Sequence, residues 1–181
     1  MTIRLATPED AGAIAEIYAP YVTGSAVSFE TEPPDAAMVR ERMAAGDGLY
    51  PWLVFEEPDG TIAGYAYATQ FRARRAYRFT VEATVYVRGD RHGRGIGARL
   101  YETLFALLTD QGFTQAIVAI TLPNDPSIKL HRAQGFTEAG VYRDVGHKLA
   151  EWRSVAIWQR PLAPPAANPA EPRPVHEAWR G

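Results

Sequence analysis

The segments TVEATVYV at residues 80–87 and RHGRGIG at residues 91–97 decide the fold of this chain. Apolar and polar residues alternate through the first segment, which predicts a strand with two different faces. The second segment is rich in glycine and arginine, and an amphipathic helix that ends at Gly112 is predicted to follow it. A strand that enters a helix through a glycine-rich turn leaves backbone N–H groups free at the helix start. The turn is therefore predicted to bind a phosphate group.

Three kinds of phosphate-binding turn are compared with this strand–turn–helix unit. A Walker loop requires Gly-Lys-Ser or Gly-Lys-Thr, which residues 91–97 lack. A dinucleotide-binding turn could use Gly93, Gly95 and Ala98, but it requires an acidic residue about 20 positions later, and residues 116–121 contain none. The pyrophosphate arm of coenzyme A is the remaining interpretation. A glycine turn that only caps the helix is the alternative.

The predicted elements on both sides of this turn make one domain. A strand at 3–6 is followed by helices at about 8–22 and 35–45, and then by strands at 52–56, 62–71 and 79–87. After the long helix come a buried strand at 116–121, a helix at 126–134 and strands near 137–143 and 152–159. This order predicts an α/β (α+β) fold in which a mixed, mostly antiparallel sheet of about seven strands has helices on both faces. Residues 1–161 form the domain, and residues 162–181 are a proline-rich tail expected to contain neither helix nor central strand.

Composition limits the possible functions. The formal net charge of −2 gives no general attraction to nucleic acid or to an anionic membrane. The chain has no cysteine, which excludes disulfides and thiolate chemistry. Its four histidines show no metal-ligand spacing, so no metal is expected. Neither a leader-like N-terminus nor a membrane-spanning stretch is present, and we expect a cytoplasmic protein.

The turn at residues 92–97 resembles the Gln/Arg-x-x-Gly-x-Gly/Ala motif with which the GNAT superfamily of acetyltransferases binds acetyl-CoA. Within that superfamily the chain is similar to the phosphinothricin and methionine sulfoximine N-acetyltransferase branch, which also ends in a proline-rich tail. This closer resemblance rests on YPWLV at 50–54, RRAY at 74–77, TVE at 80–82, LPNDPS at 122–127 and WQ at 158–159, and it covers nearly the whole chain up to about Pro161. It implies acetyl-CoA as cosubstrate, a small amino-acid-like amine as acceptor, direct transfer in a ternary complex, and a homodimer.

The resemblance also implies which residues contact acetyl-CoA. They lie on the central strand, in the glycine turn and at the start of the following short helix: Val85, Val87, His92, Gly93, Arg94, Gly95, Ile96, Gly97, Asn124 and Ser127. A backbone N–H near Val85 is expected to stabilise the charge that develops on the acetyl oxygen. His92 departs from the usual Gln or Arg, which is expected to weaken one contact. Asn124 can cap its helix as well as contact the cofactor.

Glu82 and His131 are the candidate catalytic residues. An alkylammonium must lose a proton before its nitrogen can attack a thioester, so a base is required. Strand alternation places Glu82 on the polar face of residues 80–87, and the branch has its proposed base there; a structural acid paired with an arginine is the alternative. The branch also has a histidine at His131, where it assists catalysis, contacts the cofactor or is only structural.

Four arginines between residues 72 and 78 precede Glu82. Guanidinium groups form bidentate pairs with carboxylates, so Arg72 or Arg74, together with Tyr77, is expected to hold the carboxylate of an amino-acid substrate. A solvated surface loop is the alternative. By resemblance Phe29 lines the pocket, although a core aromatic fits nearly as well.

Two other functions stay open: acetylation of protein N-termini or another amine such as a polyamine, and a CoA-binding regulatory module without turnover.

Overall fold

The computed structural model describes residues 1–181, and it confirms the predicted fold class. The helices are α1 (Ala11–Thr23), α2 (Ala36–Ala44), α3 (Ile96–Gln111), α4 (Asp125–Ala133) and α5 (Val175–Ala178). The strands are β1 (Thr2–Leu5), β2 (Trp52–Glu56), β3 (Ile62–Gln70), β4 (Thr80–Val87), β5 (Gln115–Thr121), β6 (Thr137–Lys148) and β7 (Glu151–Pro161). Three short 3-10 turns are η1 (Pro8–Asp10), η2 (Arg75–Tyr77) and η3 (Gly89–Arg91). No helix is long and apolar enough to cross a membrane.

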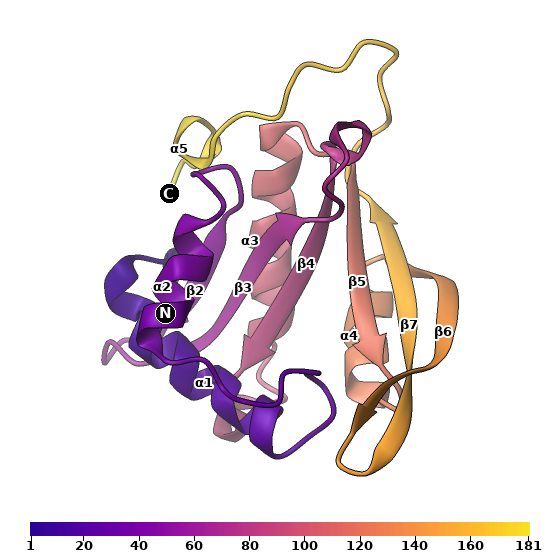
Figure 1. Ribbon diagram of the computed structural model, residues 1–181. Coiled ribbons are helices and arrows are strands. Elements are labelled where there is room, and N and C mark those ends of the chain that lie inside the picture. The colour runs from indigo at the N-terminus through magenta and orange to yellow at the C-terminus, as the bar shows by residue number, and fades with distance from the viewer.

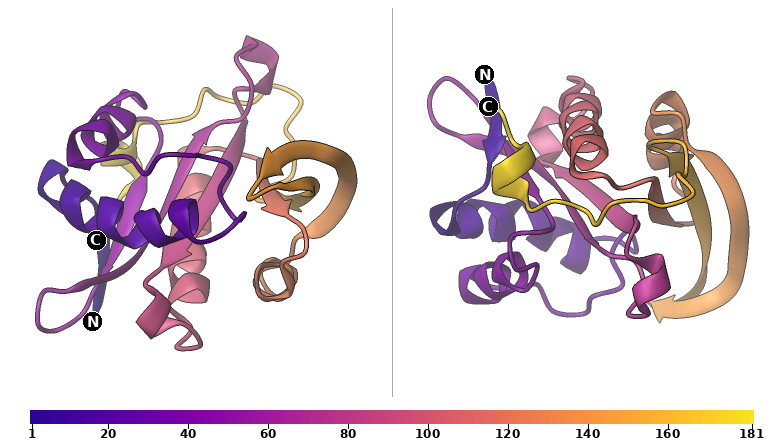
Figure 2. Two further views of the ribbon diagram at one scale, coloured as in Figure 1. Left: turned by 60° about the horizontal axis from the view of Figure 1, so that its bottom comes forward. Right: turned by 90° about the horizontal axis from the view of Figure 1, so that it is seen from above.

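All seven strands belong to one sheet in the order β1-β2-β3-β4-β5-β7-β6. Every neighbouring pair is antiparallel except β4 and β5, which run parallel. Helices α1 and α2 cover one face of the sheet, while α3 and α4 cover the other (Figures 1 and 2). The parallel pair at the centre is joined through α3, as a parallel connection requires.

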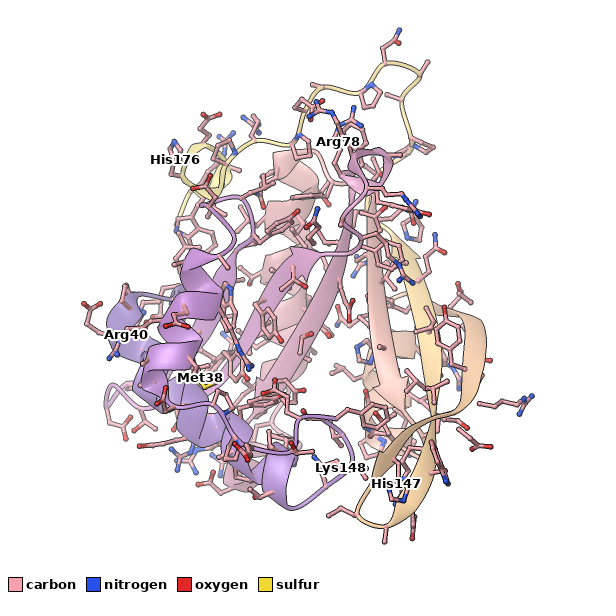
Figure 3. All side chains as sticks on the ribbon, in the orientation of Figure 1. Met38, Arg40, Arg78, His147, Lys148 and His176 are labelled. Atoms are coloured by element: carbon pink, nitrogen blue, oxygen red, sulfur yellow. The ribbon has the colours of Figure 1, made fainter.

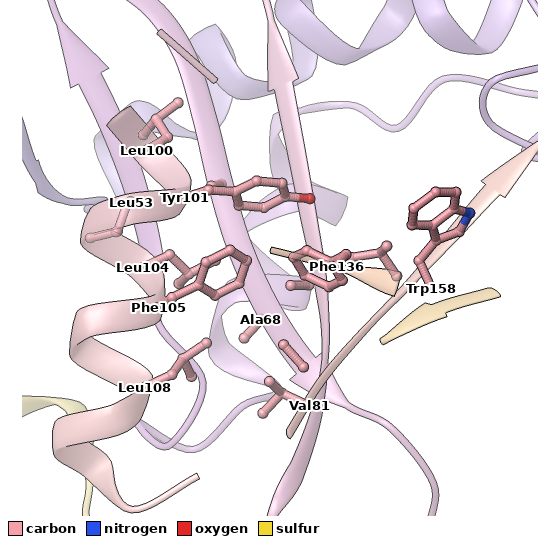
Figure 4. Packing of buried hydrophobic residues seen from close by; sticks show 14 of the residues in the cluster. Leu53, Ala68, Val81, Leu100, Tyr101, Leu104, Phe105, Leu108, Phe136 and Trp158 are labelled. Carbon is pink, nitrogen blue, oxygen red and sulfur yellow. The ribbon is translucent and has the colours of Figure 1, made fainter. Parts of the chain in front are cut away.

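The α3 face of the sheet holds the larger core. Val81 and Ala83 of β4 point toward α3, where Leu100 and Leu104 are fully buried (Figure 4). Burying a leucine side chain contributes about 1.5–3 kcal/mol, so this cluster fixes β4 firmly against α3. The strand alternation predicted for residues 80–87 is thereby confirmed, and it leaves Glu82 on the α1 face.

Aromatic residues cover the opposite, α1 face. The ring of Tyr86 lies 4.9 Å from the rings of both Tyr18 and Tyr21 of α1. On the neighbouring strands, Trp52 stacks on Tyr67 with ring centroids 4.1 Å apart. The contacts of Tyr18 and Tyr21 with Tyr86 fix α1 on the sheet, so the loop that follows α1 begins at a defined place.

Strands β4 and β5 separate halfway along their length. Only three residue pairs connect them, and the last is Glu82 with Ile117. Beyond that pair the two strands diverge toward the C-terminal end of β4, as Figure 1 shows. The β4 backbone from Ala83 onward therefore has no strand partner on its β5 side, and its polar groups there are free to bind a ligand.

The prediction for the C-terminal tail was wrong in part. Residues 175–178 form the short helix α5, and Val175 and Ala178 are buried against Leu107 of α3. Proline disfavours the interior of a helix, where it removes an N–H donor and clashes with the preceding turn, but the prolines here precede α5. Strands β6 and β7 are also longer than predicted, because a tight turn at Leu149 and Ala150 continues the hairpin.

Candidate active site

A groove of about 550 Å³ runs along the end of β4, the glycine turn and the start of α4. Of the ten residues predicted to contact the cofactor, nine line this groove: Val85, Val87, His92, Gly93, Gly95, Ile96, Gly97, Asn124 and Ser127. The tenth, Arg94, is exposed and does not line it. The fold thus brings together three segments that are up to 42 positions apart in the sequence (Val85 to Ser127).

Two glycines of the turn have an unusual backbone conformation. Gly93 and Gly95 have φ angles of 75° and 74°, in the left-handed region that favours glycine. Gly95 is the N-cap of α3, so the first N–H groups of that helix face the groove without helical acceptors. The helix dipole adds partial positive charge at the same place. Arg91 also lines the groove, but Glu57 and Asp90 pair with its guanidinium at 3.0 and 2.6 Å.

His92 is held by two neighbouring elements. Its Nε2 lies 2.7 Å from the hydroxyl of Tyr21 on α1 and 3.1 Å from the backbone carbonyl of Val87. The Tyr21 hydroxyl donates to the same carbonyl at 2.5 Å. His92, which stands where the family usually has Gln or Arg, therefore links α1, β4 and the glycine turn. The sequence did not indicate this link.

Asn124 and His131 organise α4. The Asn124 side chain caps this helix by accepting a hydrogen bond from the Ser127 N–H at 3.2 Å, as predicted. His131 is buried, and its Nδ1 donates to the Ser127 carbonyl at 2.8 Å. Its Nε2 lies 3.0 Å from the Tyr101 hydroxyl, which donates to it because the ring proton is on Nδ1. Burial lowers the pKa of His131, and the hydrogen bond to Ser127 opposes this shift. These contacts favour a neutral, positioning His131.

A narrow slot of about 60 Å³ lies where β4 and β5 separate. Its lining comes from both faces of the sheet, since Val27 belongs to the loop after α1 while Tyr101 and His131 belong to α3 and α4. Ala83 and Thr84, next to the candidate base Glu82, form part of its wall. A thioester entering from the groove would therefore come close to a group on the Glu82 face.

The side chain of Glu82 is half-buried and makes no hydrogen bond or ion pair within the chain. Burial raises the pKa of its carboxyl, and the charge of Arg72 opposes the shift. A raised pKa brings a carboxylate closer to the value that suits a general base near neutral pH. The structure does not support the alternative of a structural acid paired with an arginine. Arg72 lowers the pKa of the Glu82 carboxyl by its charge, but the two side chains form no ion pair.

The arginine segment lies between β3 and β4, on both sides of η2. Arg75 and Arg78 pair with Glu171 of the tail, while Arg72 and Arg74 are exposed and form no ion pair. Arg72 stacks on Phe71, and the ring of Tyr77 meets the same Phe71 edge-on at 5.7 Å. Arg72 and Arg74 are thus the two guanidinium groups still available to a carboxylate.

Phe29 does not line the groove or the slot. Its ring lies against Gly146 of β6, in the space that any larger side chain at that position would occupy. Val27, two residues earlier, lines both cavities instead. The role of Phe29 in substrate binding stays a prediction.

Lys148 is a residue that sequence reasoning missed. Its ammonium is buried and donates to the carbonyls of Val22 at 2.6 Å and Ser28 at 2.7 Å, which joins the end of β6 to the last turn of α1 and the loop after it (Figure 3). Burial lowers the pKa of Lys148, and the charge of Glu30 opposes this. Nothing in the local pattern of residues 137–148 signals this contact, because its acceptors are backbone atoms more than a hundred residues away.

Comparison with known proteins agrees with this geometry. The family model for the acetyltransferase (GNAT) domain matches residues 3–154. The chain belongs to the GNAT acetyltransferase family. It is 43% identical to phosphinothricin N-acetyltransferase from Streptomyces viridochromogenes, over 96% of this chain and 92% of that protein. It is 34% identical to the L-methionine sulfoximine/L-methionine sulfone acetyltransferase of Pseudomonas aeruginosa, over 93% and 98% of the two chains.

A solved structure of a GNAT relative shows the same fold. The phosphinothricin acetyltransferase from Sinorhizobium meliloti, in complex with acetyl-CoA, superposes with a TM-score of 0.89 at 38% identity. The alignment covers 94% of this chain and 93% of that one. This GNAT chain is an acetyl-CoA-dependent N-acetyltransferase, as the sequence predicted.

The groove fits the cofactor of the family. It offers free N–H groups at the start of α3 for the diphosphate and an unpaired β4 edge for the amides of the pantetheine arm. The chain has no cluster of His, Asp or Glu that could hold a metal ion.

Proposed function

We propose that this GNAT enzyme acetylates the α-amino group of a small amino-acid-like substrate such as phosphinothricin, methionine sulfoximine or methionine sulfone. The observation that supports this most directly is that the half-buried Glu82 side chain has no partner, while Arg72, which forms no ion pair, lies close enough for its charge to act on that carboxyl. One group is suited to an ammonium and the other to a carboxylate. An α-amino acid carries both, one carbon apart.

In this proposal each residue has a definite task. Acetyl-CoA supplies the activated acetyl group when it occupies the groove. Arg72 and Arg74 hold the substrate carboxylate, and Glu82 takes the proton from the ammonium directly or through a water molecule. The free N–H near Val85, where β4 leaves β5, stabilises the charge on the acetyl oxygen. The absence of cysteine agrees with direct transfer rather than a thioester-linked enzyme.

We also propose that the chain forms a homodimer through the β6–β7 hairpin. Large apolar side chains are exposed there, with Trp152 65%, Val145 55%, Leu149 55% and Tyr142 53% accessible. Exposed large apolar side chains gathered on one hairpin are typical of protein interfaces. Trp152→Asp should shift the mass measured by light scattering from dimer to monomer, and a wild type that is already monomeric would contradict the proposal.

The decisive experiment is a substrate panel followed by CoA release. It should contain phosphinothricin, methionine sulfoximine, methionine sulfone and methionine, each beside its decarboxylated amine, together with a polyamine and a short peptide with a free N-terminus. We expect kcat/KM to be highest for the carboxylate-bearing amino acids. A higher kcat/KM for the polyamine or the peptide would mean that the enzyme acts on that class of amine instead. Binding of acetyl-CoA without any turnover would indicate a regulatory module.

A further inference from the structure

The C-terminal tail reaches back to the arginine segment beside the active site. After β7 the tail crosses over the end of the sheet near η2 before it reaches α5 (Figure 1). On this path Glu171 meets Arg75, with Nη2 to Oε1 at 3.0 Å, and Arg78, whose Nε lies 3.0 Å from both carboxylate oxygens. Figure 3 shows Arg78 at this upper end of the molecule, beside the tail. One carboxylate thus joins two of the four arginines.

The tail segment that follows Glu171 is attached to the domain by backbone hydrogen bonds and buried side chains. The N–H of Arg173 donates to the Gln111 carbonyl at 2.8 Å, and the N–H of Val175 donates to the Gly48 carbonyl at 2.8 Å. Val175 and the α5 residue Ala178 are buried against α3. Glu171 therefore comes from a fixed backbone, which lowers the entropy cost that makes most exposed ion pairs weak.

Both partners of Glu171 belong to η2 or its cap, between Arg74 and Thr80. Arg78 is further fixed by stacking on Phe79, with its guanidinium carbon 4.3 Å from the ring centre. Because the chain from Arg72 to Arg78 is short, holding its second half limits where Arg72 and Arg74 can lie. Pairing also occupies Arg75 and Arg78, so only Arg72 and Arg74 remain to bind an anion.

We propose that Glu171 is a positioning residue for substrate binding: it anchors the arginine segment to the tail so that Arg72 and Arg74 face the substrate carboxylate. This inference rests on the proposed function, since it assumes a carboxylate-bearing substrate. It gives the tail a role in the acceptor site, although the tail touches neither the cofactor groove nor Glu82.

Glu171→Gln tests the proposal in the full-length enzyme. It removes the charge but keeps the size, and we expect KM for the amino-acid substrate to rise roughly two- to fivefold, the range for exposed ion pairs. The kcat, the KM for the decarboxylated amine and the dissociation constant of acetyl-CoA should stay unchanged. Amide hydrogen exchange at residues 72–78 should become faster. Glu177→Gln is the matched control, because it lies in the same tail at similar side-chain exposure (51% against 56%) and pairs with no arginine.

A double variant makes the test sharper. If Glu171 acts through Arg78, then Arg78→Gln should raise KM by a similar factor, and combining it with Glu171→Gln should add little. An unchanged KM in Glu171→Gln would overturn the proposal, and so would an equal rise for the decarboxylated amine or in Glu177→Gln. A wild type that turns over no carboxylate-bearing amine would instead refute the proposed function, and this inference with it.

Discussion

Replacing Glu82 by glutamine distinguishes a carboxylate that acts as the catalytic base from one that is only structural. The substitution keeps the size of the side chain and removes its charge. A general base contributes about 10²–10⁴ to a rate, or about 2.7–5.4 kcal/mol of barrier. Because Glu82 is only half-buried, water can reach the amine in its place, and we expect kcat to fall by the lower part of that range, about 10²–10³.

The same substitution should not destabilise the fold, because Glu82 has no partner to lose. Burial raises its pKa in the folded chain above the unfolded value, so the folded chain binds this proton more tightly. The group therefore contributes stability at low pH that is lost as the pH rises through the folded pKa. Since glutamine cannot ionise, the melting temperature of the variant should exceed that of the wild type at pH 8, and the difference should shrink toward pH 4.

The assay combines turnover and calorimetry over the same pH series. In the wild type kcat/KM should rise with pH through the raised pKa of Glu82, and this limb should be absent in Glu82→Gln. Titration with acetyl-CoA should give similar dissociation constants for both. Glu138→Gln, an exposed acid on β6, is the control. A variant with kcat within threefold of the wild type across the series, or one that melts well below it at pH 8, would refute the reasoning.

Three further outcomes follow from the structure. Gly95→Ala meets no neighbouring atom but must hold φ at 74°, so unfolding free energy should fall by about 1–2 kcal/mol and the acetyl-CoA dissociation constant should rise, as calorimetry can measure. Lys148→Met loses two hydrogen bonds from a charged donor, so denaturant titration should show that the free energy of unfolding falls by at least about 1.5–3 kcal/mol. Limited proteolysis should also cut the loop after α1 sooner. Equal stability of variant and wild type would mean that the cost of burying the ammonium cancels its contacts. Arg72→Ala combined with Arg74→Ala should raise KM for amino acids about 10- to 100-fold with little change for decarboxylated amines, and equal effects on both would argue against a carboxylate clamp.

Local sequence pattern was sufficient wherever a residue's role depends on its near neighbours. The alternation in residues 80–87 placed Glu82 opposite the α3 core. Asn124 caps α4 through Ser127, three residues away. These are strand and helix-end effects with short reach, so they can be read from spacing alone.

Contacts between distant segments were not predictable in this way. The link of Tyr21 to His92 spans 71 positions, and that of Lys148 to Val22 spans 126. The assignment of Arg75 and Arg78 to Glu171 depends on the path of the tail, and the same tail contains a helix that its proline content argued against. Each of these depends on chain segments meeting after the sheet has formed.

The sequence by itself determined the element order, the turn that can bind a diphosphate, and an acid on the polar face of β4, because backbone preferences and periodicity act over a few residues. Only the tertiary structure decided where β4 leaves β5, which two arginines stay unpaired, and that His131 is buried between Ser127 and Tyr101. The separation of the strands, the pairing of charges and the burial of polar groups depend on distances in space, which the order of residues along the chain does not specify.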